Sequence, residues 1–261
     1  MTSSPVLVNE TSGIVSITIN RPEARNSLTA HAIKLLTEAF DAVHTNRNAR
    51  CVILSGAGTE AFCAGADITE LTNNPSPASR RAFFDSIATL IEKINLAPVP
   101  VVARVHGYAL AGGCGLAAAC DITLAADDAI FGLPEVGIGL AAMVVMAPLS
   151  RVVGKKALTH LVMTGERISA KRALEIGLVT SVHTKASLDA ETDSLCKKLI
   201  KQGPQALKAS KQALLDVTER DYLPFLHELA DRSALLSLGG EATEGLTAFT
   251  EKREPLWRKG S

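Results

Sequence analysis

Short apolar segments alternate with amphipathic helical ones through the first half of the chain, and this alternation limits the possible folds strongly. Residues 14–19 alternate apolar and polar side chains with the period of a strand, and residues 20–22 end that strand. A helix then follows whose apolar stripe is Ile33, Leu36, Phe40 and Val43. Residues 51–54 form a short apolar segment typical of a buried strand. Because strand, helix and strand at this spacing make a parallel βαβ unit, the sequence predicts an α/β fold with a parallel sheet.

The pattern then repeats. A second helical stripe consists of Phe83, Ile87, Leu90, Ile91 and Ile94. Pro98 ends this helix, residues 99–105 are predicted as the next strand, and residues 121–125 and 129–131 as further short strands. Residues 72–77 (Thr-Asn-Asn-Pro-Ser-Pro) lie just before the second helical stripe. Because they are rich in turn-forming residues, they predict a mobile loop.

The character of the sequence changes at about Leu188, where strand patterns stop. The remainder predicts helices at 188–201, 205–218, 221–238 and 241–252. We therefore predict a core domain over residues 1–187 and a helical C-terminal region over 188–261. The leucines of this region exceed what a short bundle needs for itself: Leu195, Leu199, Leu207, Leu214, Leu215, Leu226, Leu229, Leu235 and Leu236. They fit either packing against other subunits or covering the core of the same chain.

Composition excludes several classes of function. The chain has 261 residues, of which 47% are hydrophobic, and its 27 basic side chains equal its 27 acidic ones, so no net field favours nucleic acid or a membrane surface as partner. The five cysteines are an odd number without a C-x-x-C pair, which indicates reduced core thiols. The six histidines lack metal-ligand spacing, so no metal is expected. Neither a targeting segment nor a membrane-spanning run is recognisable, which predicts a cytoplasmic protein.

The stretch from Ala109 to Asp121 joins an apolar run, the pair Gly112-Gly113 and an Ala-rich segment. This order predicts a strand that turns into a buried helix. The first N–H groups of a helix have no intrahelical partner, and glycine lets a ligand oxygen come close to them, so the pair suits an oxyanion site. Tight packing of the helix against a neighbour explains the same two glycines equally well.

Five segments in this order give the chain a resemblance to a known family. They are Asn20 to Leu28 (NRPEARNSL), Ala61 to Asp67 (AFCAGAD), His106 to Cys114 (HGYALAGGC), Phe131 to Glu135 (FGLPE) and Thr164 to Ala170 (TGERISA). The sequence resembles the crotonase superfamily, also called the enoyl-CoA hydratase/isomerase family. The resemblance implies a crotonase (ClpP-like) spiral of ββα units, a helical C-terminal trimerisation region, and a homotrimer or a hexamer built as a dimer of trimers. It also implies an acyl-CoA or enoyl-CoA thioester as ligand, with coenzyme A as part of the substrate and no separate cofactor.

By motif position, the resemblance assigns the backbone N–H groups of Ala66 and Gly112 to the thioester oxygen. Enolate formation places negative charge on that oxygen, and two fixed donors stabilise it. The positions that would meet the substrate or its CoA part are Ala24, Arg25, Leu28, Ala64, Asp67, Ile68, Gly113 and Lys252. Simpler interpretations stand beside these: Asp67 with Glu70 fits a helix-capping box, and Arg25 and Lys252 fit solvated surface charges.

Glu135 is the candidate general acid and base. It follows a proline among Phe131, Leu133, Val136 and Ile138, where burial would raise the pKa of a carboxyl group. An ordinary surface turn would also place a glutamate after a proline. Among the histidines, His106 fits a supporting role in its loop better than a catalytic one.

The sequence departs from the family pattern at two places. Hydratases of the family usually carry a second glutamate in a Gly-Gly-Cys-Glu sequence, where this chain has Gly115. One remaining glutamate resembles the isomerase branch, although some relatives hydrate with that glutamate alone. Residues 140–146 (LAAMVVM) replace a polar run, and they predict an apolar acyl pocket or an ordinary helix start. The expected function is an enoyl-CoA isomerase or hydratase, and the alternative is a catalytically weak acyl-CoA-binding protein.

Overall fold

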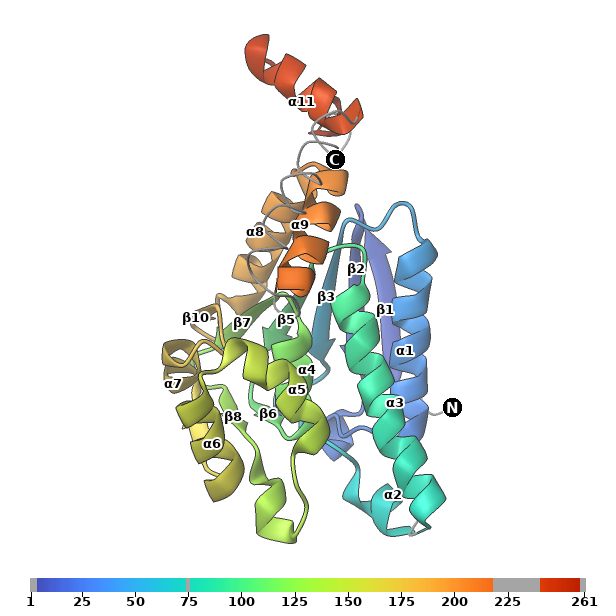
Figure 1. Cartoon of the computed structure of the whole chain (residues 1–261), viewed down its shortest axis with the longest axis vertical. Coiled ribbons are helices and arrows are strands. Elements are labelled where there is room, and N and C mark those ends of the chain that lie inside the picture. Colours follow the sequence, from blue (N-terminus) through green and yellow to red (C-terminus); the bar gives the residue numbers. More distant parts are fainter. Residues whose placement is uncertain (1–3, 74–75, 218–239, 259–261) are drawn as a thin grey trace.

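The computed structural model describes residues 4–73, 76–217 and 240–258, and two sheets form its centre (Figure 1). The six-stranded sheet has the order β1 (Val6–Thr11), β2 (Ile14–Ile19), β3 (Cys51–Gly56), β5 (Val101–Val105), β7 (Ile122–Ala126) and β10 (Ser181–His183). Its strands from β2 to β10 are parallel, and only β1 pairs antiparallel, with β2. The parallel βαβ units predicted from the apolar pattern are confirmed. The strand expected over 99–105 begins two residues later, at Val101.

The four-stranded sheet has the order β4 (Ala61–Cys63), β6 (Tyr108–Leu110), β8 (Ile130–Gly132) and β9 (Arg167–Ser169). The first three strands are parallel, and β9 runs antiparallel to β8. After the β1–β2 hairpin, each strand of the large sheet from β3 to β7 is followed by one of the small sheet and then by a helix. This order is the expected spiral of ββα units.

Helices cover both faces of the large sheet. The predicted stripes of α1 (Ala30–Thr45) and α3 (Pro77–Leu96) are buried. Along β3, Val52 and Leu54 belong to the core beneath these helices, whereas Cys51 and Ile53 belong to a second core that α8 (Leu188–Ile200) covers. Burial on both faces explains why this strand is continuously apolar in sequence.

The remaining helices surround the small sheet or extend from the core. They are α2 (Ile68–Asn73), α4 (Gly112–Ala119), α5 (Met143–Val152), α6 (Lys155–Thr164), α7 (Ala170–Glu175), α9 (Pro204–Val217) and α11 (Gly240–Thr250), with short 3-10 turns η1 (Pro22–Ala24), η2 (Pro134–Ile138) and η3 (Leu256–Arg258).

The predicted loop over 72–77 is shorter than expected. Thr72 and Asn73 belong to α2, and α3 already begins at Pro77. The reason is local: the Ser76 hydroxyl accepts a hydrogen bond from the Ser79 N–H, and a proline is favourable in the first helical position. Residues 74–75 lie outside the described part of the chain.

Within the described residues, every regular element after Leu188 is helical, as predicted. Leu195 and Leu199 of α8 pack on the core of the same chain. In contrast, α9 buries none of its residues, and Leu214 is 71% exposed. The predicted helix over 221–238 lies outside the described residues, together with Leu226, Leu229, Leu235 and Leu236. Self-association and the division at residue 187 stay predictions.

All five cysteines are buried free thiols, and the sulfurs of Cys51 and Cys196 are 3.7 Å apart. In the described ranges, no helix is both long and apolar enough to cross a membrane. The same residues hold no group of three or more His, Cys, Asp or Glu side chains placed to bind a metal ion.

Candidate active site

The predicted site segments follow three neighbouring parallel strands of the small sheet. Residues 64–67 follow β4, residues 111–113 follow β6 and residues 133–135 follow β8. The Ala111 N–H donates to the Gly132 oxygen over 2.9 Å, which joins the ends of β6 and β8. Because parallel strands end at the same edge of a sheet, the fold gathers segments that are distant in sequence. Ligands commonly bind at such carboxyl edges.

The backbone is strained where the predicted donor N–H groups lie. Ala111, directly before α4, has φ 50° and ψ −119°, a conformation that costs a residue with a side chain of order 1–3 kcal/mol. Opposite it, Gly65 has φ 99°, and a Cβ there would come within 2.6 Å of the Ala111 Cβ. A Cβ built on Gly112 would lie 3.8 Å from the Ala66 nitrogen. Among the described residues, neither the Gly112 N–H nor the Ala66 N–H has a protein acceptor.

The two glycines of the pair have different surroundings. A Cβ on Gly112 would meet the flexible Leu28 side chain at 3.2 Å and the Gly65 Cα at 3.4 Å. A Cβ on Gly113 would overlap the Cys63 carbonyl group, whose carbon would lie 2.8 Å away. Gly113 therefore allows α4 to pack tightly on β4, whereas Gly112 faces the space beside Ala66. Tight packing therefore explains Gly113, whereas the oxyanion role of Gly112 and a substrate contact for Gly113 stay predictions.

The segment after η1 fixes the position of Ala66. The Leu28 N–H donates to the Gly65 oxygen over 2.7 Å, and the Asp67 N–H donates to the Leu28 oxygen over 2.9 Å. These bonds occupy the groups on both sides of Ala66, while its own N–H has no acceptor in the described part of the chain. Leu28 is fully buried, and one of its methyl groups lines the space next to Gly112; its predicted contact with the CoA part of the substrate stays a prediction.

Sequence reasoning missed Asn26, which organises the same region. Asn26 is fully buried, and its Oδ1 accepts from the Arg21 N–H over 2.9 Å. Its Nδ2 donates to the oxygens of Ala57 and Ala61 over 2.9 and 2.7 Å. Asn26 and Arg25 have φ values of 56° and 52°, and asparagine tolerates this left-handed region well. The signal was present in the first family motif as the asparagine between Arg25 and Ser27.

Asp67 is an ion-paired capping residue. Arg21 Nη2 lies 3.0 Å and Ser27 Oγ 3.1 Å from its Oδ2, and the Glu70 N–H donates to Oδ1 over 3.3 Å. Burial alone would raise the pKa of Asp67, but these bonds outweigh it and lower the pKa below its usual range. The predicted capping box is half correct, because the Glu70 carboxylate instead accepts from the Ala30 N–H at the start of α1.

Glu135 lies in η2 directly after Pro134, as its motif predicts. Its Oε2 is buried and has no hydrogen-bond partner among the described residues, and burial raises the pKa of the carboxyl group above its ordinary value. The carboxyl group acts electrostatically on the buried Cys114 thiol of α4, whose pKa burial raises to about 12. The predicted surroundings are correct for buried Phe131 and Leu133, but Val136 and Ile138 are exposed.

At Gly115, where the family pattern has a second glutamate, the neighbouring space is filled by another side chain. A Cβ built on Gly115 would lie 2.5 Å from the Val145 Cβ and closer still to one of its methyl groups. Val145 is buried in α5, which begins inside the divergent segment 140–146, whereas Met143 of the same segment is 70% exposed. The segment is therefore partly core and partly surface. The two departures from the family pattern, Gly115 and the segment 140–146, therefore contact each other through Val145.

Of the other predicted contacts with the substrate, Ala24, Arg25, Ala64 and Ile68 lie on the two segments that meet at Ala66, and only Lys252 lies apart. Ala24 ends η1, and the exposed Arg25 side chain forms an ion pair with Glu60 over 3.2 Å. The Ala64 N–H donates to the Arg25 oxygen, and Ile68 is 49% exposed. Lys252 is exposed and follows α11, which lies at the opposite end of the long axis from α2 (Figure 1). One chain does not bring Lys252 to the other residues.

His106 supports its loop. It is buried between β5 and β6, its oxygen accepts from the Phe62 N–H, and its Nδ1 lies 3.0 Å from Arg104. Burial lowers the pKa of His106, and Arg104 adds to this.

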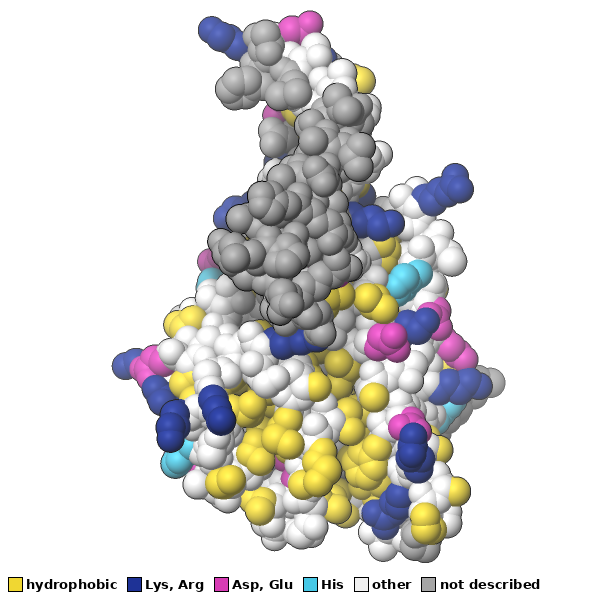
Figure 2. Space-filling view, in the orientation of Figure 1, with side chains coloured by type: hydrophobic (Ala, Val, Ile, Leu, Met, Phe, Trp, Pro, Cys, Tyr) yellow, Lys and Arg dark blue, Asp and Glu magenta, His cyan; other side chains and the backbone are white. Residues whose placement is uncertain are grey.

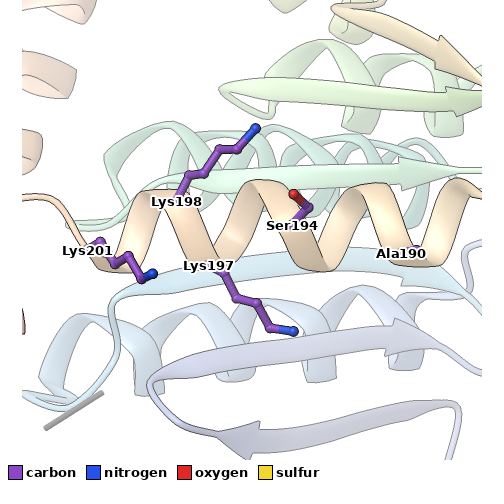
Figure 3. Close-up of a pocket in the computed structure, with 5 residues that line it drawn as sticks. All are labelled: Ala190, Ser194, Lys197, Lys198 and Lys201. Carbon is purple, nitrogen blue, oxygen red and sulfur yellow. The ribbon is translucent and has the colours of Figure 1, made fainter.

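Apolar side chains gather on the face that carries α5 and the lower part of α3 (Figure 2). Two pockets are lined by residues other than the predicted site residues. One, of about 460 Å³, lies between α3, α5 and α9. The other, of about 370 Å³, is lined by residues of α8 and its C-cap, among them Lys197, Lys198 and Lys201 (Figure 3). In the close-up, Lys198 points away from Lys197, so the three charges do not converge on one point.

Comparisons with known proteins agree with these motifs. The sequence model of the family described as enoyl-CoA hydratase/isomerase matches residues 9–260. A short-chain-enoyl-CoA hydratase of Clostridium acetobutylicum is 33% identical over 251 residues, 95% of either chain. The crystal structure of an enoyl-CoA hydratase of Mycobacterium smegmatis matches with a TM-score of 0.95 at 34% identity, covering 98% of this chain and all of the other. An enoyl-CoA hydratase structure from Bacillus anthracis gives 0.92 at 33% identity, covering 97% and 99%.

Proposed function

The chain belongs to the enoyl-CoA hydratase/isomerase family, and from this premise we propose that it moves a proton on an enoyl-CoA thioester. Glu135 is the general acid and base, and the N–H groups of Ala66 and Gly112 bind the thioester oxygen. One observation carries the proposal. A buried carboxylate oxygen without a partner lies at the strand edge that also carries two N–H groups without acceptors in the described part of the chain.

The proposed reaction converts a 3-enoyl thioester into a 2-enoyl thioester. The Glu135 carboxylate takes a proton from carbon 2, and the electron pair of that C–H bond forms the enolate. The two N–H groups stabilise the charge on the enolate oxygen, each donor contributing about 2.7–4 kcal/mol in a dry site. The protonated carboxyl group then gives the proton to carbon 4, and the double bond moves from carbons 3 and 4 to carbons 2 and 3. The carboxylate is restored, so no other reactant is consumed.

The raised pKa of Glu135 suits both halves of this cycle. A carboxyl group whose pKa lies closer to the working pH gives up its proton less readily than an ordinary glutamate and accepts one more readily. Hydration needs a water molecule oriented for attack on carbon 3, and relatives that bear the name hydratase make it the second candidate. The absence of a side chain at Gly115 favours isomerisation.

The test compares the native chain with Glu135→Gln on 2-enoyl-CoA and 3-enoyl-CoA of several chain lengths. We expect the native chain to isomerise the 3-enoyl substrate, and the variant to lose roughly 10²–10⁴-fold in turnover because it cannot transfer the proton. The activity of the native chain should decline on acidification at a higher pH than an ordinary glutamate, with a pKa of about 4.3, would give.

Three other outcomes decide against parts of the proposal. Faster hydration of the 2-enoyl substrate than isomerisation of the 3-enoyl one would replace isomerase by hydratase. Equal activity in Glu135→Gln would remove Glu135 from the chemistry. Tight acyl-CoA binding without turnover, unchanged in the variant, would establish the binding protein instead. Calorimetry on the same two proteins separates a loss of binding from a loss of turnover.

A further inference from the structure

The side chain that contacts Gly115 belongs to α5, on the far side of the active-site helix from β4. Gly115 follows Gly112 by three positions in α4, and residues three apart share a helix face. The face that begins at the proposed thioester-oxygen site with Gly112 therefore continues to Gly115. There the isopropyl group of Val145 occupies the volume that a side chain at residue 115 would need. Val145 itself is buried, and Ala142 one turn earlier is buried with it.

The described carboxylates near this strand edge, other than Glu135, are already engaged. Asp67 is bonded to Arg21, Ser27 and the Glu70 N–H, and its lowered pKa keeps it ionised. The Glu70 carboxylate accepts from the Ala30 N–H, and the Glu166 carboxylate lies against His160. None of these three carboxylates is free to hold a water molecule opposite Glu135.

We propose that Val145 is the residue that determines whether this chain isomerises or hydrates its enoyl thioester. Its side chain fills the position at which a polar group would orient water, so the proton on Glu135 returns to the substrate. The inference rests on the proposed function, because it presupposes that Glu135 and the two N–H groups act on an enoyl thioester. It goes beyond that function by assigning the outcome to packing between α4 and α5.

The close approach of Gly115 and Val145 determines which variants can test the proposal. A glutamate at position 115 does not fit beside Val145, and Val145→Ala would not make room, because the Cβ itself would be 2.5 Å from the new Cβ. Only removal of the whole side chain opens the position. The informative set is therefore Gly115→Glu, Val145→Gly and the double variant. Val144→Gly is the matched control, because it makes the same change in the same helix at a residue that faces the pocket between α3, α5 and α9.

Stability measurements test the packing without reference to activity. We expect Gly115→Glu alone to lower the Tm by roughly 5 °C or more, because it overpacks a buried contact. In the double variant, Gly115→Glu should lower the Tm by much less than it does in the native chain. When Gly115→Glu is combined with Val144→Gly instead, it should lower the Tm as much as it does in the native chain. Additive Tm shifts for residues 115 and 145 would overturn the contact on which the proposal rests.

The product ratio tests the chemistry. We expect the double variant to raise the ratio of hydration to isomerisation by about tenfold or more, and Val144→Gly to leave it at the native value. A folded double variant with the native ratio, in a protein whose native form is active, would overturn this inference alone. A native chain inactive on both substrates would overturn the proposed function and this inference together, while the Tm measurements would still report on the packing.

Discussion

The two sheets of this protein differ in how they use their residues. The six-stranded sheet has strands of three to six residues, and helices bury both faces of its central strands, whereas the edge strand β1 is largely exposed. The four-stranded sheet has strands of only three residues each, yet the segments after three of them carry the proposed donors and Glu135. The large sheet holds the fold together by apolar burial, and the small sheet positions backbone groups.

This difference extends to what fixes each region in place. In the large sheet, strand pairing and the packing of buried side chains are enough to fix the strands in place. Around the small sheet, close backbone approaches at Gly113 and Gly107, a strained Ala111 and the buried Asn26 amide set the geometry. We therefore expect substitutions near the small sheet to separate activity from stability in ways that substitutions in the large sheet do not.

We expect the sharpest separation of activity from stability within the pair Gly112-Gly113. Gly113→Ala would drive a methyl group into the Cys63 carbonyl, and we expect it to lower the free energy of unfolding by about 3 kcal/mol. Gly112→Ala meets only a flexible Leu28 methyl and the Gly65 Cα, so its stability should change by less than about 1 kcal/mol. Its methyl group would, however, lie beside the Ala66 N–H, and turnover should fall about 100-fold.

Urea unfolding and steady-state kinetics on both variants measure this contrast. Because the two substitutions add the same methyl group to adjacent residues, each is the control for the other. If both variants lost stability to the same extent, or if Gly112→Ala kept native turnover, the distinction between a packing glycine and a site glycine would be lost.

The same contrast explains what the sequence predicted. Four strands of the large sheet (β2, β3, β5 and β7), its βαβ units and both helical stripes follow from apolar periodicity, because strands of five or six residues and long helices are long enough to show a period. The edge strands β1 and β10 were not predicted. Three-residue strands such as β4 and β6 are too short for that. The strand before Gly112 was predicted from its apolar run, whereas β4 was reached only through the resemblance of its motif. The partial burial of Glu135 agrees with Phe131 and Leu133, although Val136 and Ile138 are exposed.

Three features could not be predicted because they depend on contacts between distant segments. Nothing local to Gly115 or Val145 says that they touch. Nothing in the sequence distinguishes Gly112 from Gly113 until the Cys63 carbonyl is placed beside one of them. Asp67 and Glu70 have the spacing of a capping box, but Glu70 is diverted to α1 because the fold brings the Ala30 N–H within reach.

Asn26 offers a second way to compare the regions. Asn26→Ala would leave the Ala57 and Ala61 oxygens and the Arg21 N–H without their side-chain partner, and we expect a loss of roughly 3 kcal/mol in the free energy of unfolding. The control in the large sheet is Ser55→Ala, which removes one bond of 3.1 Å to Thr18 and should cost about 1 kcal/mol or less. Urea midpoints give both values, and equal losses would contradict the special dependence of the small sheet on polar contacts.

Asp67 should have the smallest effect, and one that depends on pH. Its folded pKa is lowered, so its bonds to Arg21, Ser27 and the Glu70 N–H stabilise the fold fully above the unfolded pKa of about 3.9, and this stabilisation is lost as the pH falls through the lower folded value. Asp67→Asn should therefore destabilise by about 1 kcal/mol near neutral pH, and the difference from the native chain should shrink below about pH 4. Tm measured across this range decides. A difference that stayed constant with pH would mean that the charge on Asp67 does not stabilise the strand edge, and that its hydrogen bonds to the α2 backbone act alone.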